Sequence, residues 1–234
     1  MIAKEYADFS WQQAEQLLSI DSPSGFTSYA AAWLQSSFAV LGFDAKITTK
    51  GGVLVDLGGE DESNGLMLAA HTDTLGGMVA EVKGSGRLRL TPLGGMEANN
   101  AEAENVRIYT RSGKVFEGTL QLCNASVHVN KDYHSAKRDW SAMEVVLDED
   151  VASCEDTKKL GIEVGDIVCF DPRTRRTQTG YLKSRFLDDK LSVGILLGFA
   201  KYLSECGATP ARKSRSPSAP RIPAVLTAMR SSAS

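Results

Sequence analysis

The sequence lacks the marks of a secreted, membrane-spanning or zinc-ribbon protein. Its four cysteines are scattered, and no pair stands at a C-x-x-C or disulfide-scaffold spacing, so we expect free thiols in a reducing compartment. No run approaches the ~20 apolar residues that cross a bilayer. Residues 1–20 also lack the basic region, apolar run and cleavage site of a signal peptide. These absences predict a cytoplasmic protein without a membrane partner.

An excess of charge of one sign is missing as well. The 26 Lys and Arg nearly balance the 29 Asp and Glu, which gives a formal net charge of −3 and no global basic field for nucleic acid. A local basic run contains Arg173, Arg175, Arg176, Lys183 and Arg185, and no aromatic residue interrupts its first part. We interpret this run as the solvated face of a hairpin and expect no nucleic-acid partner.

What is present is an ordinary globular composition, since 42% of the 234 residues are hydrophobic and 24% are charged. Helical spacing of apolar residues predicts helices at about 9–20 and 27–41, separated by a turn rich in Ser, Pro and Gly. Short apolar runs typical of strands follow at 45–49, 53–57 and 66–70. The last run is continuously apolar, which predicts a strand buried on both faces in an α/β layer.

The pattern changes over residues 75–184. Helical periodicity disappears there, and short β-rich runs separated by Gly, Asn or Asp predict an all-β module. Helical spacing then returns, with a predicted apolar stripe of Leu191, Ile195, Leu196, Phe199, Ala200 and Leu203. We therefore predict one α/β domain, built from residues 1–74 and 185–213, into which the β module is inserted.

The last segment, residues 214–234, has an unusual composition. It is rich in Ser and Pro and contains no acidic or aromatic residue. A segment of this kind buries too little apolar surface to offset the entropy lost on ordering, so we expect it to be disordered. It stands where an α/β domain would continue with another strand.

Two groups of residues carry candidate chemistry. His71 and Asp73 follow the apolar run 66–70, at the strand end where open α/β sheets bind ligands. A metal-bound histidine needs an acceptor at its second ring nitrogen, which Asp73 could supply; the alternative is a hydrogen-bonded structural histidine. Asp188 and Asp189 stand directly before the later helix, where they could bind a metal ion or cap the helix.

Four ordered motifs together carry a family resemblance. They are DSPSG at 21–25, HTDTLG at 71–76, GDIVCFDPR at 165–173 and KSRFLDDK at 183–190. With them the chain resembles the tetrahedral aminopeptidases, a family of cytoplasmic co-catalytic metallopeptidases. That family includes glutamyl and deblocking aminopeptidases and some members labelled endoglucanases.

The resemblance implies a phosphorylase/hydrolase-like α/β metallopeptidase domain whose inserted β module forms homodimers, which assemble further into a dodecamer. It implies a metal-dependent aminopeptidase that removes N-terminal residues from a peptide substrate with two divalent ions, zinc or cobalt. His71 would bind one metal ion, and Asp188 would bridge both through a cis peptide bond to Asp189. Asp73 would be the catalytic-site residue that orients His71.

The chain departs from this family after Lys190. The family completes its site with a Glu-Glu or similar pair, a further carboxylate and a distal histidine, whereas Glu205 is the single acidic residue here beyond Lys190. We therefore expect an incomplete site and an inactive, C-terminally truncated chain. Regrouping the codons from Lys213 by two nucleotides, with permitted synonymous choices, yields a strand-like segment that contains Glu-Asp, which favours a reading-frame shift.

Two alternative functions come from other classes. The chain could be a non-catalytic fragment that keeps only the self-association of the β module, or an endoglucanase-like glycoside hydrolase. A glycosidase needs carboxyl groups on opposite sides of a sugar, and the adjacent Asp188 and Asp189 do not suit that arrangement.

Other polar residues of the β module have simpler interpretations. His128 is either a site histidine or a surface residue, and His134 is expected in a solvated loop. Glu97, Glu102 and Glu104 surround two asparagines and are interpreted as a charged turn.

Overall fold

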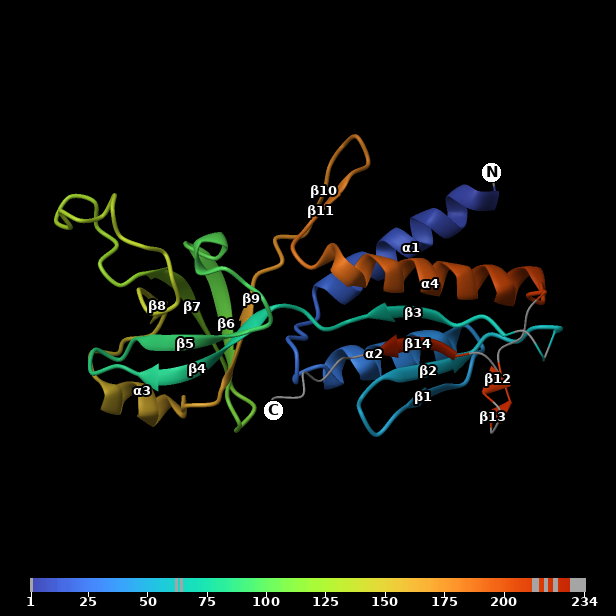
Figure 1. Cartoon of the computed structure of the whole chain (residues 1–234), viewed down its shortest axis with the longest axis horizontal. Coiled ribbons are helices and arrows are strands. Elements are labelled where there is room, and N and C mark those ends of the chain that lie inside the picture. Colours follow the sequence, from blue (N-terminus) through green and yellow to red (C-terminus); the bar gives the residue numbers. More distant parts are fainter. Residues whose placement is uncertain are drawn as a thin grey trace. The chain divides into compact units, whose positions relative to one another are not determined.

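Two units of the chain are separated at Thr74 and Pro172. They are Met1–Thr74 with Pro172–Ser234, here called the helix-and-sheet unit, and Leu75–Asp171, the barrel unit (Figure 1). The computed structural model describes residues 2–61, 63, 65–211, 215–216, 219–220 and 223–227, with side chains for residues 4–61, 63 and 65–211. No helix in these ranges is both long and apolar enough to cross a bilayer.

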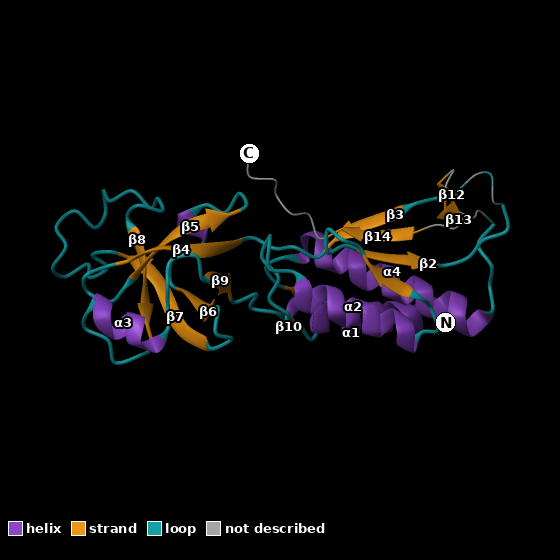
Figure 2. Cartoon of the chain, turned by 90° about the horizontal axis from the view of Figure 1, so that it is seen from below, coloured by secondary structure: helices purple, strands orange, loops and turns teal. Residues whose placement is uncertain are grey.

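The helix-and-sheet unit contains a four-stranded sheet in the order β1-β2-β14-β3. The strands are β1 (Ala45–Ile47), β2 (Val53–Asp56), β3 (Leu68–His71) and β14 (Pro223–Thr227). Strand β14 runs antiparallel to β2 and parallel to β3. The helices α1 (Ile2–Leu18), α2 (Ser28–Val40) and α4 (Leu187–Cys206) lie on one side of this sheet (Figure 2).

Apolar side chains between the helices and the sheet form the core of this unit. Phe38 of α2, Val53 of β2 and Leu197 of α4 are among its fully buried members. Each large apolar side chain of this kind contributes roughly 1.5–3 kcal/mol when it leaves water. The predicted pair of amino-terminal helices and the three strands that follow them are confirmed.

Two predictions about burial in this unit are wrong. Strand β3 is not buried on both faces, because the described helices cover only one side of the sheet and Ala69 is exposed. In α4, Leu196, Ala200 and Leu203 are buried as predicted, but Ile195 is 55% exposed. Phe199, also expected in the buried stripe, is 36% exposed.

Small residues explain the orientation of α4. A Cβ atom on Gly194 would lie 2.7 Å from the backbone oxygen of Ser10 and 2.9 Å from Cβ of Ala14. A Cβ on Gly198 would lie 3.0 Å from the backbone oxygen of Tyr6. Helix α1 therefore packs directly against the glycine side of α4, which turns Ile195 towards solvent. The apolar spacing contained no signal for this close approach.

The barrel unit consists of six antiparallel strands that close in the order β4-β5-β8-β7-β6-β9. They are β4 (Gly76–Val82), β5 (Leu88–Leu93), β6 (Glu104–Tyr109), β7 (Val115–Leu122), β8 (Met143–Leu147) and β9 (Ile167–Phe170). A single 3-10 turn, Ala98–Asn100, joins β5 and β6. Alternate residues of β6 and β7 point into the barrel, as the period of two in their sequence requires.

One helix of the barrel unit, α3 (Cys154–Leu160), was not predicted from the sequence. The side chain of Ser153 accepts a hydrogen bond from the backbone N–H of Asp156, and Gly161 ends the helix at φ 96°. Ser, Thr, Asp or Asn at the start and Gly at the end are the usual helix boundaries. The helix has too few apolar residues to show helical periodicity, so its capping residues were the available signal.

The ends of the predicted β module and the tail differ from the sequence-based division. Residues 172–184 group with the helix-and-sheet unit, where they form the hairpin of β10 (Arg175–Arg176) and β11 (Leu182–Lys183). In the tail, β12 (Arg215–Ser216) pairs with β13 (Ala219–Pro220). Strand β14 occupies the place between β2 and β3, so the structure differs there from the expected disorder. The other residues of 214–234 lie outside the described ranges.

Candidate active site

His71 is the last residue of β3, where the strand leads into the loop before the barrel. Its ring atom Nδ1 lies 3.1 Å from Oδ1 of Asp73 and 3.2 Å from the backbone oxygen of the same residue. The His71 side chain is 37% exposed, whereas that of Asp73 is 14% exposed. The Nδ1 side of the ring is therefore held by Asp73, while the side chain as a whole remains partly accessible to solvent.

Asp73 is itself held by the turn at residues 21–25. Ser24 Oγ donates a hydrogen bond of 2.6 Å to Oδ2 of Asp73. The buried Ser22 Oγ donates one of 2.7 Å to the backbone oxygen of Thr72. Backbone bonds from Thr74 to Ser22 (2.8 Å) and from Ser24 to Thr74 (3.2 Å) join the two segments. The motifs 21–25 and 71–76 thus form one hydrogen-bonded unit, a contact that the sequence did not predict.

Asp188 lies at the start of α4 and contacts the ring of His71. Its Oδ1 lies 3.2 Å from Nε2 of His71, on the side of the ring opposite Asp73. The side chain of Asp188 is 95% exposed. The peptide bond from Asp188 to Asp189 is cis, as the family resemblance implied.

The helix-capping interpretation applies to Asp189 rather than to Asp188, because Asp189 directly precedes the regular part of α4. Both aspartates have non-helical backbone angles, so the regular helix begins after them. The carboxylate of Asp188 instead faces the histidine.

Lys190 anchors the start of α4 to the end of α1. It is 1% exposed, and its Nζ donates hydrogen bonds of 3.0 Å to the backbone oxygen of Leu17 and 2.6 Å to that of Ile20. Carbonyls at the end of a helix need donors, and a buried ammonium needs acceptors, so each group satisfies the other. This contact fixes the segment that carries Asp188, a role of Lys190 that no pattern in the sequence indicates.

The donor set of this site suits a divalent cation. Two ligands that each lie about 2.0–2.1 Å from a tetrahedral ion are about 3.3 Å apart, and the His71 nitrogen and Asp188 oxygen are 3.2 Å apart. A carboxylate on the second ring nitrogen is the usual partner of a metal-bound histidine. Within the described ranges, no cluster of three or more His, Cys, Asp or Glu side chains is arranged to hold a metal ion. The described residues therefore supply two adjacent ligand positions.

The sequence matches the family described as M42 glutamyl aminopeptidase over residues 51–210. The chain belongs to this family. It is 45% identical over 183 residues to YhfE of Bacillus subtilis strain 168, a protein whose name assigns it as an aminopeptidase. The match covers 78% of this chain and 53% of YhfE. The family is one of enzymes, so the predicted recognition and enzyme class are confirmed.

Two solved structures show the same fold. The TET aminopeptidase of Thaumarchaeota archaeon SCGC AB-539-E09 has a TM-score of 0.79 at 20% identity, covering 94% of this chain and 59% of that one. The TET1 peptidase of Pyrococcus horikoshii, described as assembling into a tetrahedron or an octahedral shell, has a TM-score of 0.74 at 19% identity, covering 93% and 60%. The chain thus spans 53–60% of the length of these three relatives.

The other polar residues singled out in the sequence belong to the barrel unit of this M42 chain. His128 and His134 are exposed in the connection between β7 and β8. Glu102 pairs with Arg138 at 3.2 Å, as expected for a charged turn. Glu104 differs, because it begins β6 and is buried.

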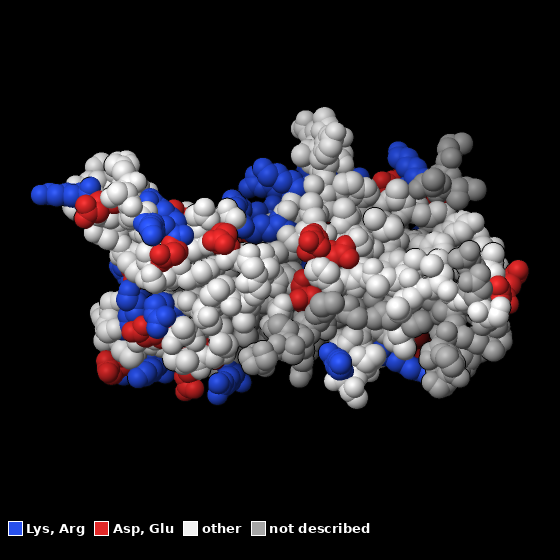
Figure 3. Space-filling model, in the orientation of Figure 1, with Lys and Arg blue, Asp and Glu red and all other residues white. Residues whose placement is uncertain are grey.

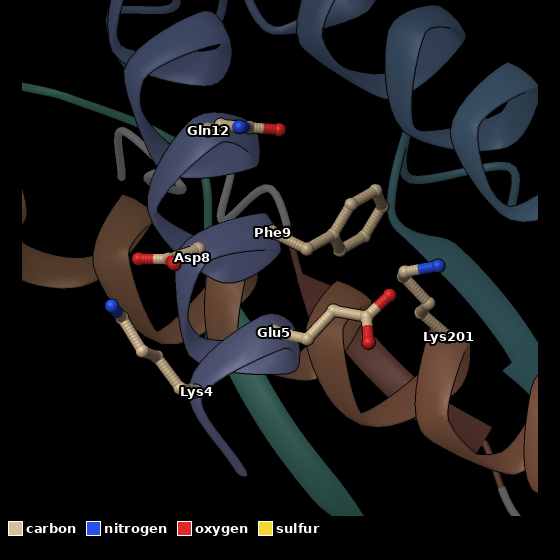
Figure 4. A pocket seen from close by; sticks show the side chains of 6 residues that line it. All are labelled: Lys4, Glu5, Asp8, Phe9, Gln12 and Lys201. Carbon is tan, nitrogen blue, oxygen red and sulfur yellow. The ribbon is translucent and has the colours of Figure 1, made fainter. Parts of the chain in front are cut away.

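A pocket of about 510 Å³ lies against α1 and α4 (Figure 4). Its lining mixes both charges and consists of Lys4, Glu5, Asp8, Phe9, Gln12 and Lys201. Glu5, Phe9 and Lys201 point into one space, where Nζ of Lys201 lies 5.4 Å from the centre of the Phe9 ring. None of the residues of the His71 site lines this pocket, so it is not part of the candidate active site.

Proposed function

We propose that the chain carries part of the active site of a metal-dependent aminopeptidase that hydrolyses N-terminal residues of peptides. The observation that carries this proposal is the His71 ring, placed between Asp73 on one nitrogen and Asp188 on the other. Zinc and cobalt both suit an imidazole and carboxylate donor set. The family membership supports peptides as substrates.

Each residue has a distinct role in this proposal. His71 would hold an ion through Nε2, and the exposed carboxylate of Asp188, which has two oxygens, would serve both ions. Asp73 positions the His71 ring and fixes which nitrogen carries its proton. The ions, when bound, polarise the peptide carbonyl and lower the pKa of a bound water.

Metal titration of the 234-residue chain tests these roles without relying on turnover. Calorimetry with Zn²⁺ should show weak binding that His71→Ala and Asp188→Ala abolish, since each removes a ligand. Asp73→Asn should weaken binding roughly 10–100-fold. His134→Ala is the matched control, because His134 is exposed in the barrel unit. Binding that survives both ligand substitutions would contradict the assignment.

We propose that the 234-residue chain by itself turns over no peptide, because two ligand positions do not make a complete two-metal site. A chain read in the restored frame after Lys213 should hydrolyse aminoacyl-anilides and lose that activity with chelator. Cellulosic substrates in the same assay distinguish the glycoside hydrolase, and chelator-resistant sugar hydrolysis would overturn the proposal.

We further propose that the barrel unit mediates self-association in a reducing cytoplasm. The assembly of the Pyrococcus horikoshii relative supports an oligomer, from dimer to dodecamer. All four cysteines of the chain are free, which is consistent with a reducing compartment. Light scattering during size-exclusion chromatography measures the assembly, and a strictly monomeric protein at micromolar concentration would contradict it.

A further inference from the structure

The basic run identified in the sequence lines a pocket. A space of about 490 Å³ is bounded by Pro172, Arg173, Arg175, Lys183, Ser184 and Arg185. Its lining has four basic side chains and, among the described residues, no acidic one. Figure 3 shows basic side chains gathered beside the β10–β11 hairpin. This arrangement differs from the mixed charges of the pocket against α1 and α4.

Hydrogen bonds join the two sides of the hairpin base at this pocket. Oγ of Ser184 donates a bond of 3.0 Å to the backbone oxygen of Pro172 and lies 2.8 Å from Oγ1 of Thr174. The backbone N–H of Arg185 donates a bond of 2.8 Å to the same Pro172 oxygen. The two sides of the hairpin base are therefore tied together before any ligand arrives.

The hairpin also places two cations directly opposite each other. Arg175 and Lys183 are paired residues of the β10–β11 ladder. Directly opposed like charges destabilise an antiparallel pair. Arg176, the neighbouring residue, lies 3.6 Å from Asp8 and over the ring of Trp11, so that cation is compensated within the fold. Arg173 and Arg185 make further interactions within the protein. We therefore take Arg175 and Lys183 as the two side chains that bind the ligand.

We propose that this pocket binds a carboxylate of the peptide substrate. An anion between Arg175 and Lys183 would offset the repulsion between them, and each basic group can form a charge-assisted hydrogen bond. The proposal rests on the proposed function, because the pocket residue Arg185 belongs to the same short segment as Asp188 of the candidate active site. Arg185 precedes Asp188 by three residues, so the two Cα atoms are at most ~11 Å apart, within the length of a short peptide.

A peptide fits this pocket better than a nucleic acid. Single-stranded nucleic acids use aromatic side chains for base stacking beside a basic groove, and the lining of this pocket contains none. The chain has a formal net charge of −3, so no wider basic field draws a phosphate backbone to it.

Calorimetry with short peptides tests the proposal in the presence of chelator, so that the metal site plays no part. The probes are Ala-Ala-Glu-Glu with a free carboxyl terminus and its neutral counterpart Ala-Ala-Gln-Gln amide, at an ionic strength of about 20 mM where screening is small. The acidic peptide should bind and the neutral one should not. Arg175→Gln with Lys183→Gln should weaken binding at least about tenfold.

The control variant is Lys50→Gln, an exposed lysine of the same unit outside the pocket, which should bind as the parent chain does. The thermal midpoint of the double variant should not fall, because the substitution removes two opposed charges. Equal binding of the neutral peptide, or unchanged binding by the double variant, would overturn the proposal. So would tighter binding of a single-stranded oligonucleotide, or of inorganic phosphate alone, than of the acidic peptide.

The two proposals can fail separately. Absence of acidic-peptide binding together with His71-dependent Zn²⁺ binding would refute the carboxylate pocket and leave the metallopeptidase site standing. Acidic-peptide binding that the double variant abolishes, together with Zn²⁺ binding that is indifferent to His71, would refute the metal site instead.

Discussion

In the barrel unit every strand has a hydrogen-bonded neighbour on both sides, whereas the described sheet of the helix-and-sheet unit ends at β1 and β3. The barrel encloses its apolar side chains by closing on itself. The sheet relies on helices that cover one side (Figure 2). The candidate chemistry lies in the more open unit, at the end of an edge strand, because a ligand needs access that a closed barrel denies. Four predictions test how independent and how different the two units are.

The largest expected effect comes from removing a buried aromatic ring in one unit. Phe38→Ala should destabilise the helix-and-sheet unit by about 3–5 kcal/mol, because the fully buried ring leaves a cavity. Phe170→Ala should have the same effect in the barrel. Denaturant unfolding followed by fluorescence separates the units in two single-tryptophan backgrounds, one that keeps only Trp33 of the first unit and one that keeps only Trp140 of the second.

If the units fold independently, each substitution shifts only its own transition. A shift of both transitions by Phe38→Ala would show that the units unfold together, which would contradict their independent folding.

Gly194→Ala should cost about 2–3 kcal/mol, because the added methyl group meets the backbone of α1 and forces the two helices apart. Gly84→Ala in the barrel unit is the matched control, since no atom lies within 4 Å of its added Cβ. Chemical denaturation of both variants measures the difference. Equal stabilities would contradict the close packing of α1 on α4.

Glu144→Gln should destabilise the barrel by about 1.5 kcal/mol at neutral pH, because the buried carboxylate is bonded by Lys83 and Arg87. Burial opposes ionisation of Glu144, but these two cations outweigh it and lower its pKa below the ordinary 4.5. The ionised form stabilises the fold above that value, and the stabilisation is lost as the pH falls below it.

Barrel stability measured by Trp140 fluorescence should therefore fall on acidification below about pH 4.5 in the parent chain. The same profile should be flatter in Glu144→Gln. Parallel profiles would show that another carboxylate is responsible.

The smallest effect is expected at the start of α3. Ser153→Ala should cost about 1 kcal/mol, because Asp156 loses the side-chain acceptor for its backbone N–H. Ser153→Thr keeps a hydroxyl group and should retain most of the stability. Hydrogen exchange at α3 measures the local change, and equal protection in both variants would argue against the cap.

Local patterns were sufficient for much of the fold. The early helices and strands follow from the spacing of residues such as Leu34 and Val55, because helix and strand periods arise from backbone bonds among near neighbours. The same reasoning failed for α3, which has little apolar periodicity, and for Ile195, whose exposure depends on α1. It also did not place strand β14 in the sheet, because pairing with β2 and β3 is a contact between distant parts of the chain.

The sequence by itself determined the family and indicated the candidate site residues, since His71 and Asp73 follow one strand and Asp188 precedes the regular part of one helix. Only the tertiary structure decided that these residues meet. Asp188 reaches His71 across 117 positions of sequence, and Ser24 reaches Asp73 across 49. The contact of Asp188 depends on how Lys190 and the glycines of α4 dock that helix on α1. Packing between distant segments leaves no period in the sequence that could reveal it.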